Sequence, residues 1–271
     1  MASNAAGVKS ALTVSWSDPT GCDGIAADLR TFGAFAVHGS GIVAGIRTEE
    51  KVTSIPVPDL EGQIRRALSA LGPAPVKVTF MGIPETDIAI AAALVANGVG
   101  HVVLDASSSA PVSPLTKDAV DVFKSNVGRH AEVLVTDIAG AQSLAGVKIA
   151  NQTAMRPVAK LLCRLGPRFV LIAGSQLPGD DVTDIMFDGT QNLEFPGERF
   201  TPPEPTGVAS TYACAVTAGL AHGRSVEEAV AIARIYVTET MRSAFPVGES
   251  LATSSQLYAW WAGTGRQGYG G

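Results

Sequence analysis

The chain alternates short apolar runs with helical stretches, and this alternation limits the possible folds more than any other feature. Four apolar runs have the length and composition of strands that are covered on both faces: residues 76–82, 101–107, 132–138 and 169–175. Helical patterns separate these runs at residues 84–98, 114–127 and 152–165. Parallel strands need such long crossovers, which are usually helices. The sequence therefore predicts an α/β protein whose mostly parallel central sheet is covered by helices on both faces.

The flanking regions extend the same pattern. Further strands are expected at residues 11–17, 41–48 and 52–57, and further helices at residues 24–36 and 59–71, the second with Asp59 as its N-cap. After residue 180, a hairpin (residues 184–189 and 192–200) precedes two helices, at residues 206–222 and 225–244. No internal repeat or linker is visible. We therefore expect one domain, residues 1–271, with mobile ends at residues 1–10 and 262–271.

Composition restricts the functions that are open to this chain. Hydrophobic residues make up 46% and charged residues 17% of the sequence, which is typical of a globular protein. The net charge of −5 comes without any stripe of Lys and Arg, which argues against nucleic acid as a partner. No apolar run is long enough to span a membrane. The 3 cysteines are widely spaced, which suits a reducing compartment, so we expect a soluble, cytoplasmic protein.

Ligands of open α/β sheets bind beyond the carboxyl ends of the strands, so the residues after each strand are the candidates for a site. No metal centre is predicted among them. The 4 histidines are scattered without the spacing of metal ligands. Asp180, Asp181 and Asp184 could attract magnesium, but "PGDDVTD" is equally typical of a polar turn before an edge strand, and we favour the turn.

One of these segments carries a resemblance to a known family. Residues 12–39, "LTVSWSDPTGCDGIAADLRTFGAFAVHG", resemble the opening of the hydroxymethylpyrimidine and phosphomethylpyrimidine kinases of thiamin biosynthesis, which belong to the ribokinase-like superfamily. That opening is roughly A-G-S-D-x-S-G-G-A-G-I-Q-A-D-L-K-T. The residues kept here are Ser17, Asp18, Pro19, Gly21, Gly24, Ile25, Ala27, Asp28, Leu29 and Thr31. Weaker similarity extends over residues 11–248, and it implies a three-layer ribokinase-like sandwich and a homodimer.

The resemblance assigns a pyrimidine pocket to the opening loop and the next strand. It implies that Asp28 contacts the substrate, and it places Glu49 where the family has a Gln that pairs with the aminopyrimidine edge. A carboxylate can also accept from an exocyclic amine. Trp16 stands at the family's first glycine and Asp23 at an alanine of the loop. Two alternatives stay open: Asp28 could cap or orient its helix, and Trp16 could fill the core rather than stack on a ring.

The segments that would hold phosphates depart from the family pattern. The anion hole, G-T-G-C or G-T-G-D at a helix N-terminus, corresponds to Gly207, Val208, Ala209 and Ser210, which puts Ser210 at the position of the catalytic Cys or Asp. A serine hydroxyl is barely ionisable at pH 7 without a base, and Glu204 is the nearest carboxylate in sequence. Ser210 could instead cap the helix.

Two further family motifs are altered. In the segment compared with T-P-N-x-x-E-A, residues 136–141, Ile138 replaces the Asn and no Glu is present, although these two residues organise metal and phosphates in the family. Ala173 stands where the family has a phosphate-binding Lys. Loss of one such donor typically costs about 100- to 1,000-fold in rate. We therefore expect catalysis that is weak or lost.

Three hypotheses for the function remain open. The first is a kinase that uses Mg-ATP to phosphorylate a hydroxymethylated pyrimidine or a similar ring alcohol. The second is a non-catalytic protein of the same fold that binds a small heteroaromatic ligand as a sensor or regulatory partner and needs no cofactor. The third is a structural or interaction protein in which both sites are vestigial.

Overall fold

The computed structural model describes residues 7–48, 51–108, 115–200, 205–249 and 251–263. Its centre is a 9-stranded sheet with the order β3-β2-β1-β4-β5-β6-β7-β8-β9. The strands are β1 (Ser10–Ser17), β2 (His38–Arg47), β3 (Val52–Ser54), β4 (Val76–Thr79), β5 (Val102–Asp105), β6 (Val133–Asp137), β7 (Phe169–Ala173), β8 (Val182–Phe187) and β9 (Asn192–Gly197). From β2 to β7 every neighbouring pair is parallel. The predicted α/β fold with a mostly parallel sheet is therefore confirmed.

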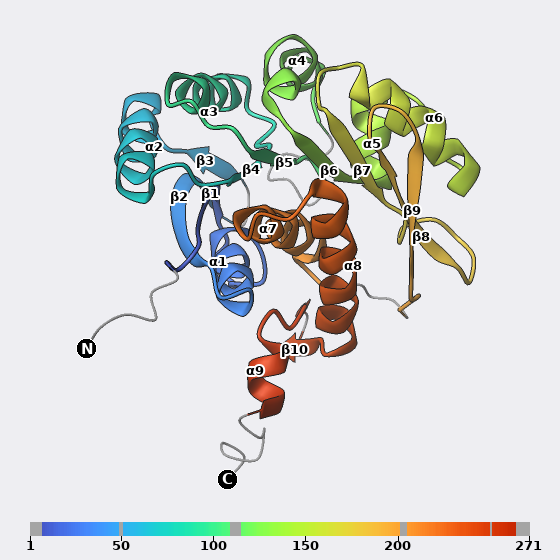
Figure 1. Ribbon diagram of the computed structural model, residues 1–271. Coiled ribbons are helices and arrows are strands. Elements are labelled where there is room, and N and C mark those ends of the chain that lie inside the picture. Colours follow the sequence, from blue (N-terminus) through green and yellow to red (C-terminus); the bar gives the residue numbers. More distant parts are fainter. Residues whose placement is uncertain (1–6, 49–50, 109–114, 201–204, 250, 264–271) are drawn as a thin grey trace.

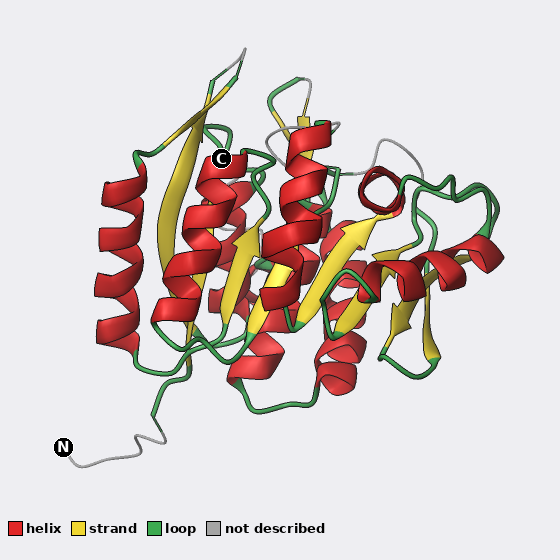
Figure 2. Ribbon diagram, turned by 90° about the horizontal axis from the view of Figure 1, so that it is seen from above, coloured by secondary structure: helices red, strands yellow, loops and turns green. Residues whose placement is uncertain are grey.

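Helices cover both faces of this sheet (Figure 1). One face carries α2 (Val57–Leu71), α3 (Pro84–Ala96), α4 (Lys117–Val122), α5 (Ile138–Ala145) and α6 (Gln152–Cys163). The opposite face carries α1 (Gly24–Ala34), α7 (Val208–Ala221) and α8 (Val226–Arg242), and the strands run between the two layers (Figure 2). A π turn (Phe123–Val127) and a 3-10 turn (Gly128–His130) extend α4, and the pair β10 (Phe245–Val247) and β11 (Leu251–Thr253) leads to α9 (Tyr258–Gly263).

Each helix layer forms its own core against the sheet. On one side Leu60, Ile64 and Leu68 of α2 pack with the helices that follow it and with one face of the strands. On the other side residues of α7 and α8, such as Tyr212 and Val230, pack against the opposite face of β5, β6 and β7. Because α7 also packs against α1, the first turns of these two helices meet above the ends of the strands.

The differences from the sequence prediction have local causes. The second helix begins at Val57 with Pro56 at its N-cap, because Pro58 fits the first helical turn, and Asp59 lies inside that turn instead of capping it. The helix α5 follows β6 directly and was not predicted. The antiparallel hairpin of β8 and β9 confirms the predicted one. However, β8 is not an edge strand, and Asp184 on it is fully buried in an ion pair with Arg234 of α8.

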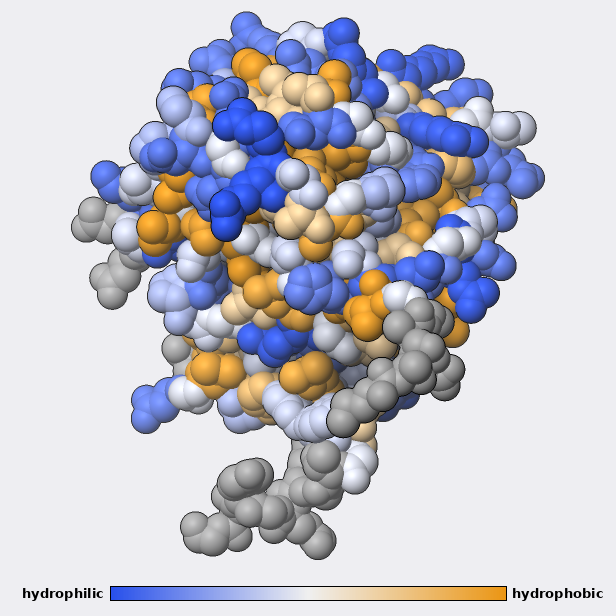
Figure 3. Space-filling model, turned by 60° about the vertical axis from the view of Figure 1, so that its left-hand side comes forward, coloured by the Kyte–Doolittle hydropathy of each residue, from blue (hydrophilic) through white to orange (hydrophobic). Residues whose placement is uncertain are grey.

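The surface offers no large apolar face in the view that brings the left side of Figure 1 forward. There, hydrophobic residues lie in small groups between hydrophilic ones (Figure 3). No helix among the described residues is long and apolar enough to cross a membrane. Of the chain ends predicted to be mobile, residues 1–6 and 264–271 lie outside the described part, whereas Ser10 belongs to β1 and α9 extends to Gly263.

Candidate functional site

The opening loop connects β1 to α1 and is held together by its own polar groups. The Asp18 carboxylate accepts hydrogen bonds from the backbone N–H groups of Thr20 and Asp23, both at 3.1 Å. Asp23 is the N-cap of α1, and its Oδ1 accepts from the Gly24 N–H at 2.7 Å. Gly24 has φ +60°, and a Cβ atom there would lie 2.3 Å from the Trp16 carbonyl oxygen. Only glycine fits this return of the chain onto the end of β1.

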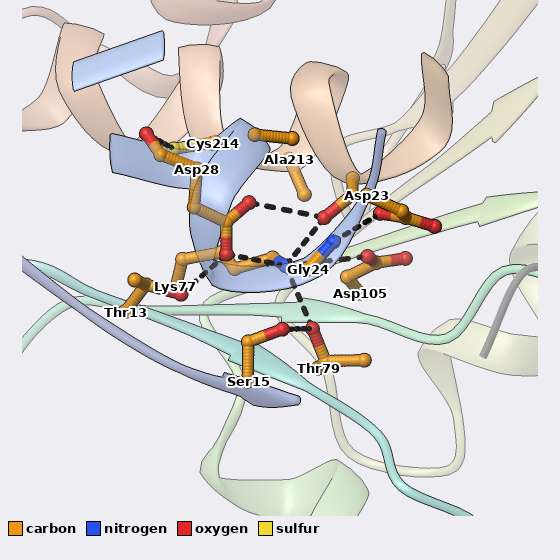
Figure 4. A network of polar contacts seen from close by, with 12 residues as sticks. Thr13, Ser15, Asp23, Gly24, Asp28, Lys77, Thr79, Asp105, Ala213 and Cys214 are labelled. Atoms are coloured by element: carbon orange, nitrogen blue, oxygen red, sulfur yellow. Dashed lines mark hydrogen bonds and ion pairs between the residues drawn. The ribbon is translucent and has the colours of Figure 1, made fainter. Parts of the chain in front are cut away.

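A fully buried lysine, Lys77 of β4, lies below this loop (Figure 4). Its ammonium donates to Asp28 Oδ2 at 3.0 Å, to Thr79 Oγ1 at 2.7 Å and to Ser210 Oγ at 2.8 Å. The Asp105 carboxylate at the end of β5 lies 3.5 Å from the same ammonium. A lysine is almost never buried unless it is paired. Here strands β4 and β5 and helices α1 and α7 all supply partners.

Asp28 is the acidic centre of this cluster. Its side chain is fully buried in α1, and Thr13 Oγ1 and Ser210 Oγ donate to its two oxygens at 2.5 and 3.0 Å, in addition to the bond from Lys77. Burial raises the pKa of the Asp28 carboxyl, while Lys77, Thr13 and Ser210 oppose that rise. Asp28 therefore links α1 to the sheet and to α7 through its hydrogen bonds. It does not cap α1, whose N-cap is Asp23.

The same charges govern Lys77. Burial alone would lower the pKa of its ammonium, but Asp28 and Asp105 raise that pKa above its usual value. Lys77 thus stays protonated at any physiological pH. The cluster places one fixed positive charge under the first turn of α7, where a transferred phosphoryl group would need it.

Ser210 lies in the first turn of α7, with only 2% of its surface exposed. Its hydroxyl accepts from Lys77 and donates to Asp28, so both of its hydrogen-bonding roles are in use. It does not cap the helix, because the N-cap is Gly207 and no side chain bonds there. Sequence distance concealed the Ser210–Asp28 pair, which joins residues 182 positions apart. Glu204 lies outside the described residues.

The start of α7 and the opening loop are in direct contact. Gly207 has φ +83°, and a Cβ atom there would lie 2.2 Å from the Cys22 carbonyl oxygen and 3.4 Å from the Asp23 Cα atom. Since no side chain caps α7, the N–H groups of its first turn are available to an anion. Val208 and Ala209 supply two of these groups. The segment predicted to be the anion hole therefore forms an uncapped helix start with a left-handed glycine, although three of its four side chains differ from the family pattern.

Trp16 is 1% exposed at the end of β1 and belongs to the core between the sheet and α2. The Arg47 guanidinium carbon lies 4.7 Å from the centre of its ring, a cation–π contact that covers the indole from the β2 side. This arrangement favours the space-filling alternative for Trp16. Glu49, the other residue assigned to the pyrimidine pocket, lies outside the described residues.

The segments predicted to hold nucleotide phosphates form a second polar cluster. Asp137 caps α5 through the Gly140 N–H at 2.8 Å, and it also accepts from the Ser108 N–H at 3.0 Å, from the Ser108 hydroxyl and from Gln176 Nε2 at 3.0 Å. Gln176 also accepts from the Ala139 N–H at 3.0 Å. The oxygens of the one carboxylate in this cluster are therefore already engaged by the chain itself.

The second cluster is tightly packed around Gly140. A Cβ atom at Gly140 would lie 2.3 Å from the Ala106 carbonyl oxygen and 2.5 Å from Thr136 Oγ1. The described residues contain no group of three or more His, Cys, Asp or Glu that could hold a metal ion. The residues present thus do not fit a protein-bound magnesium ion without rearrangement.

The structure brings Trp16, Asp23, Asp28 and the 207–210 segment close together. Sequence reasoning missed Lys77 and Asp105. The signal for Lys77 was present, since a single lysine interrupts the apolar run "VKVTF" and a charged residue in a strand covered on both faces needs buried partners.

The fold and this site define a class of protein. The structure superimposes on a pyridoxal kinase of Bacillus subtilis with a TM-score of 0.85, at 23% identity, covering 93% of this chain and 99% of the other. It superimposes on a phosphomethylpyrimidine kinase of Clostridium difficile with a TM-score of 0.73, at 26% identity, covering 85% and 98%. The chain is an α/β protein of the ribokinase-like fold.

Sequence comparison narrows that class to a family. Residues 18–254 match the family model for phosphomethylpyrimidine kinase. The hydroxymethylpyrimidine/phosphomethylpyrimidine kinase of Rhizobium meliloti is 30% identical, over 93% of this chain and 98% of the relative. The thiamine biosynthesis bifunctional protein ThiED of Geobacter sulfurreducens is 32% identical over 92% of this chain, which spans about half (52%) of that relative. The protein belongs to the phosphomethylpyrimidine kinase family, as the resemblance of its opening loop predicted.

Proposed function

We propose that this protein transfers a phosphoryl group from ATP to the hydroxymethyl group of a pyrimidine, at a rate well below that of its relatives. One observation carries the proposal: the fixed ammonium of Lys77 lies under an uncapped helix start, beside the carboxyl ends of β4 and β5. A fixed cation and converging backbone N–H groups stabilise the transition state of phosphoryl transfer.

The reduced rate follows from the second cluster. Asp137 is engaged by Ser108, Gly140 and Gln176, and Ala173 offers no cation to the nucleotide phosphates. Each such loss typically costs about 100- to 1,000-fold in rate, although the losses are not additive. ATP with its magnesium ion is a co-substrate in this proposal, as the complexes of a Staphylococcus aureus pyridoxal kinase with AMP-PCP illustrate for a structural neighbour.

The test is a phosphoryl-transfer assay with Mg-ATP and hydroxymethylpyrimidine, with a relative such as the Rhizobium meliloti kinase as the positive control. We expect turnover that is at least about 100-fold slower than that of the relative. The variant Lys77→Met should abolish that residual turnover, which separates it from a contaminating kinase. Turnover equal in the wild type and in this variant would refute the proposal.

A second function, binding of a small heteroaromatic ligand without catalysis, is supported by the contrast between the opening loop and the phosphate segments. The opening loop keeps the family's Asp18 and Gly24 in an ordered turn, whereas the Asp137 carboxylate is engaged by the chain itself. Titration calorimetry with hydroxymethylpyrimidine and with pyridoxal distinguishes the two proposals. Ligand binding with no turnover would favour the binding protein, as a sensor or regulatory partner. A homodimer remains a proposal from the family resemblance, and a location in the cytoplasm remains a proposal from the widely spaced cysteines.

A further inference from the structure

We propose that the Asp23 carboxylate accepts the proton of the substrate hydroxyl during phosphoryl transfer at the start of α7. This inference rests on the proposed kinase function, and it names the residue that performs the step for which Ser210 is unsuited. A hydroxyl group that attacks phosphorus must give up its proton, and a positioned base usually takes it.

The other polar groups of the Lys77 cluster are excluded by their own contacts. The Ser210 hydroxyl is barely acidic, and it is bonded on both sides, to Lys77 and to Asp28. Lys77 is protonated and cannot accept a proton. Asp28 is fully buried and accepts from three donors, Thr13, Lys77 and Ser210. These three donors occupy both oxygens of the Asp28 carboxylate, which leaves it no free position for a substrate hydroxyl.

Asp105 is also engaged. Its Oδ1 accepts from the Ser107 N–H at 3.2 Å and from the Ser107 hydroxyl at 2.7 Å, while its Oδ2 faces the Lys77 ammonium at 3.5 Å. Both of its oxygens are therefore already occupied by contacts within the chain, which leaves no free position for a substrate hydroxyl.

Asp23 differs from these groups in both position and bonding. Its side chain accepts a single hydrogen bond from the described residues, from the Gly24 N–H, which leaves Oδ2 without a donor. The Asp23 Cα atom would lie 3.4 Å from a Cβ at Gly207, so Asp23 borders the first turn of α7. Figure 4 shows Asp23 on the same side of the Lys77 ammonium as Asp105. Asp23 is 2% exposed, so its carboxyl group lies almost buried beside the uncapped start of α7.

The charges around Asp23 suit a proton acceptor near neutral pH. Burial raises the pKa of its carboxyl to about 7, and Asp105 and Asp28 add to the rise, while the Gly24 N–H and the Lys77 ammonium oppose it. Two further titratable groups adjoin Asp23: Asp18, whose carboxylate accepts from the Asp23 N–H, and Cys22, its neighbour in sequence. A base is most effective when its pKa lies close to the working pH.

In the proposed transfer, the substrate oxygen forms a bond to the γ-phosphorus of ATP, and the bond from that phosphorus to the β–γ bridging oxygen breaks. The electron pair of the broken bond leaves with ADP. The hydroxyl proton passes to Asp23, which returns it to solvent after the product departs. No oxidant or reductant is involved.

The variant Asp23→Asn tests the role of Asp23 in proton transfer without removing its structural role as the N-cap of α1. Asparagine is as good an N-cap as aspartate, so α1 and its bond from Gly24 are retained while the base is removed. In wild type, kcat/KM with Mg-ATP and hydroxymethylpyrimidine should rise with pH through an inflection near 7, as the pKa of about 7 requires. In D23N, kcat should fall by about 100-fold or more, and the inflection should disappear. Binding of hydroxymethylpyrimidine, measured by calorimetry, should change little.

The matched control is Asp59→Asn, which removes an exposed carboxylate from the first turn of α2. D59N should keep the wild-type rate and inflection. An active wild type whose kcat and inflection survive in D23N within about 3-fold overturns the role of Asp23 and leaves the kinase function intact, since a lost base costs more. A wild type without turnover overturns the kinase function and, with it, the role of Asp23. A ¹³C NMR titration of Asp23 that shows no change between pH 6 and 8 also overturns it.

Discussion

Replacing Lys77 with methionine removes the only positive charge described in direct contact with Asp28 and Asp105 while keeping most of the side-chain volume. Three hydrogen bonds of 2.7–3.0 Å are lost, and the fully buried Asp28 carboxylate keeps only two hydroxyl donors. Removal of one partner from a buried ion pair costs about 3–5 kcal/mol in the free energy of unfolding. For a chain of this size, that loss lowers Tm by roughly 6–20 °C.

The assay is urea unfolding of K77M, Asp28→Asn and the double variant, followed by circular dichroism at pH 8. Asp28 and Lys77 are in contact, so the double variant should be destabilised by less than the sum of the single variants, with a coupling of about 1–3 kcal/mol. A destabilisation of K77M below about 1 kcal/mol, or strictly additive losses, would show that Lys77 does not hold the cluster together.

The loss in K77M should also depend on pH, with a sign that the pKa of Asp28 fixes. Burial already raises that pKa in the wild type, and removing Lys77 raises it further. A carboxyl group whose pKa is higher in the folded than in the unfolded state destabilises the fold increasingly as pH rises through that interval. K77M should therefore be closer to wild type in stability at pH 5 than at pH 8. The reverse order would contradict the assignment.

Three substitutions test other parts of the site. Gly207→Ala should destabilise the protein by about 1–3 kcal/mol, because φ is +83° and the new Cβ would meet the Cys22 carbonyl oxygen. Its control is Gly62→Ala in α2, where nothing lies within 4 Å of the new Cβ, and this variant should stabilise the protein by up to about 1 kcal/mol. Urea unfolding measures both changes. Gly140→Ala should lower stability, because its Cβ would meet the Ala106 carbonyl oxygen; unchanged stability in urea unfolding would refute this. Trp16→Gly, a return to the family residue, should cost about 3–5 kcal/mol in stability if the indole fills the core, which thermal unfolding measures.

Sequence reasoning placed much of the site because its signals are local. The opening loop is recognisable from Asp18, Gly21 and Gly24, whose roles are a side-chain bond to the next backbone groups, a turn and a close approach to Trp16. The strand and helix periods predicted the parallel sheet. The anion-hole segment was assigned to the start of a helix, and α7 begins there, at Val208. The assigned roles of these residues in substrate binding and catalysis stay predictions.

Other features of the site depend on contacts between distant segments. The sequence suggested that Ser210 has no carboxylate partner, yet Asp28 lies 3.0 Å from it because α1 and α7 pack side by side. The sequence gives no reason for a glycine at position 140, but the close packing of α5 against Ala106 requires it. No pattern in the chain shows which atoms fill a space.

The sequence by itself determined the fold class and the family, because periodicity and short motifs act over a few residues, and it predicted the end of the sheet where a ligand would bind. Only the tertiary structure decided which groups share that end. Lys77 of β4, Asp105 of β5, Asp28 of α1 and Ser210 of α7 meet through packing of four elements. The raised pKa of Asp23 likewise arises from burial and from carboxylates that the fold places nearby. Electrostatic energy depends on distance in space and on the exclusion of water, and neither can be deduced from the order of residues alone.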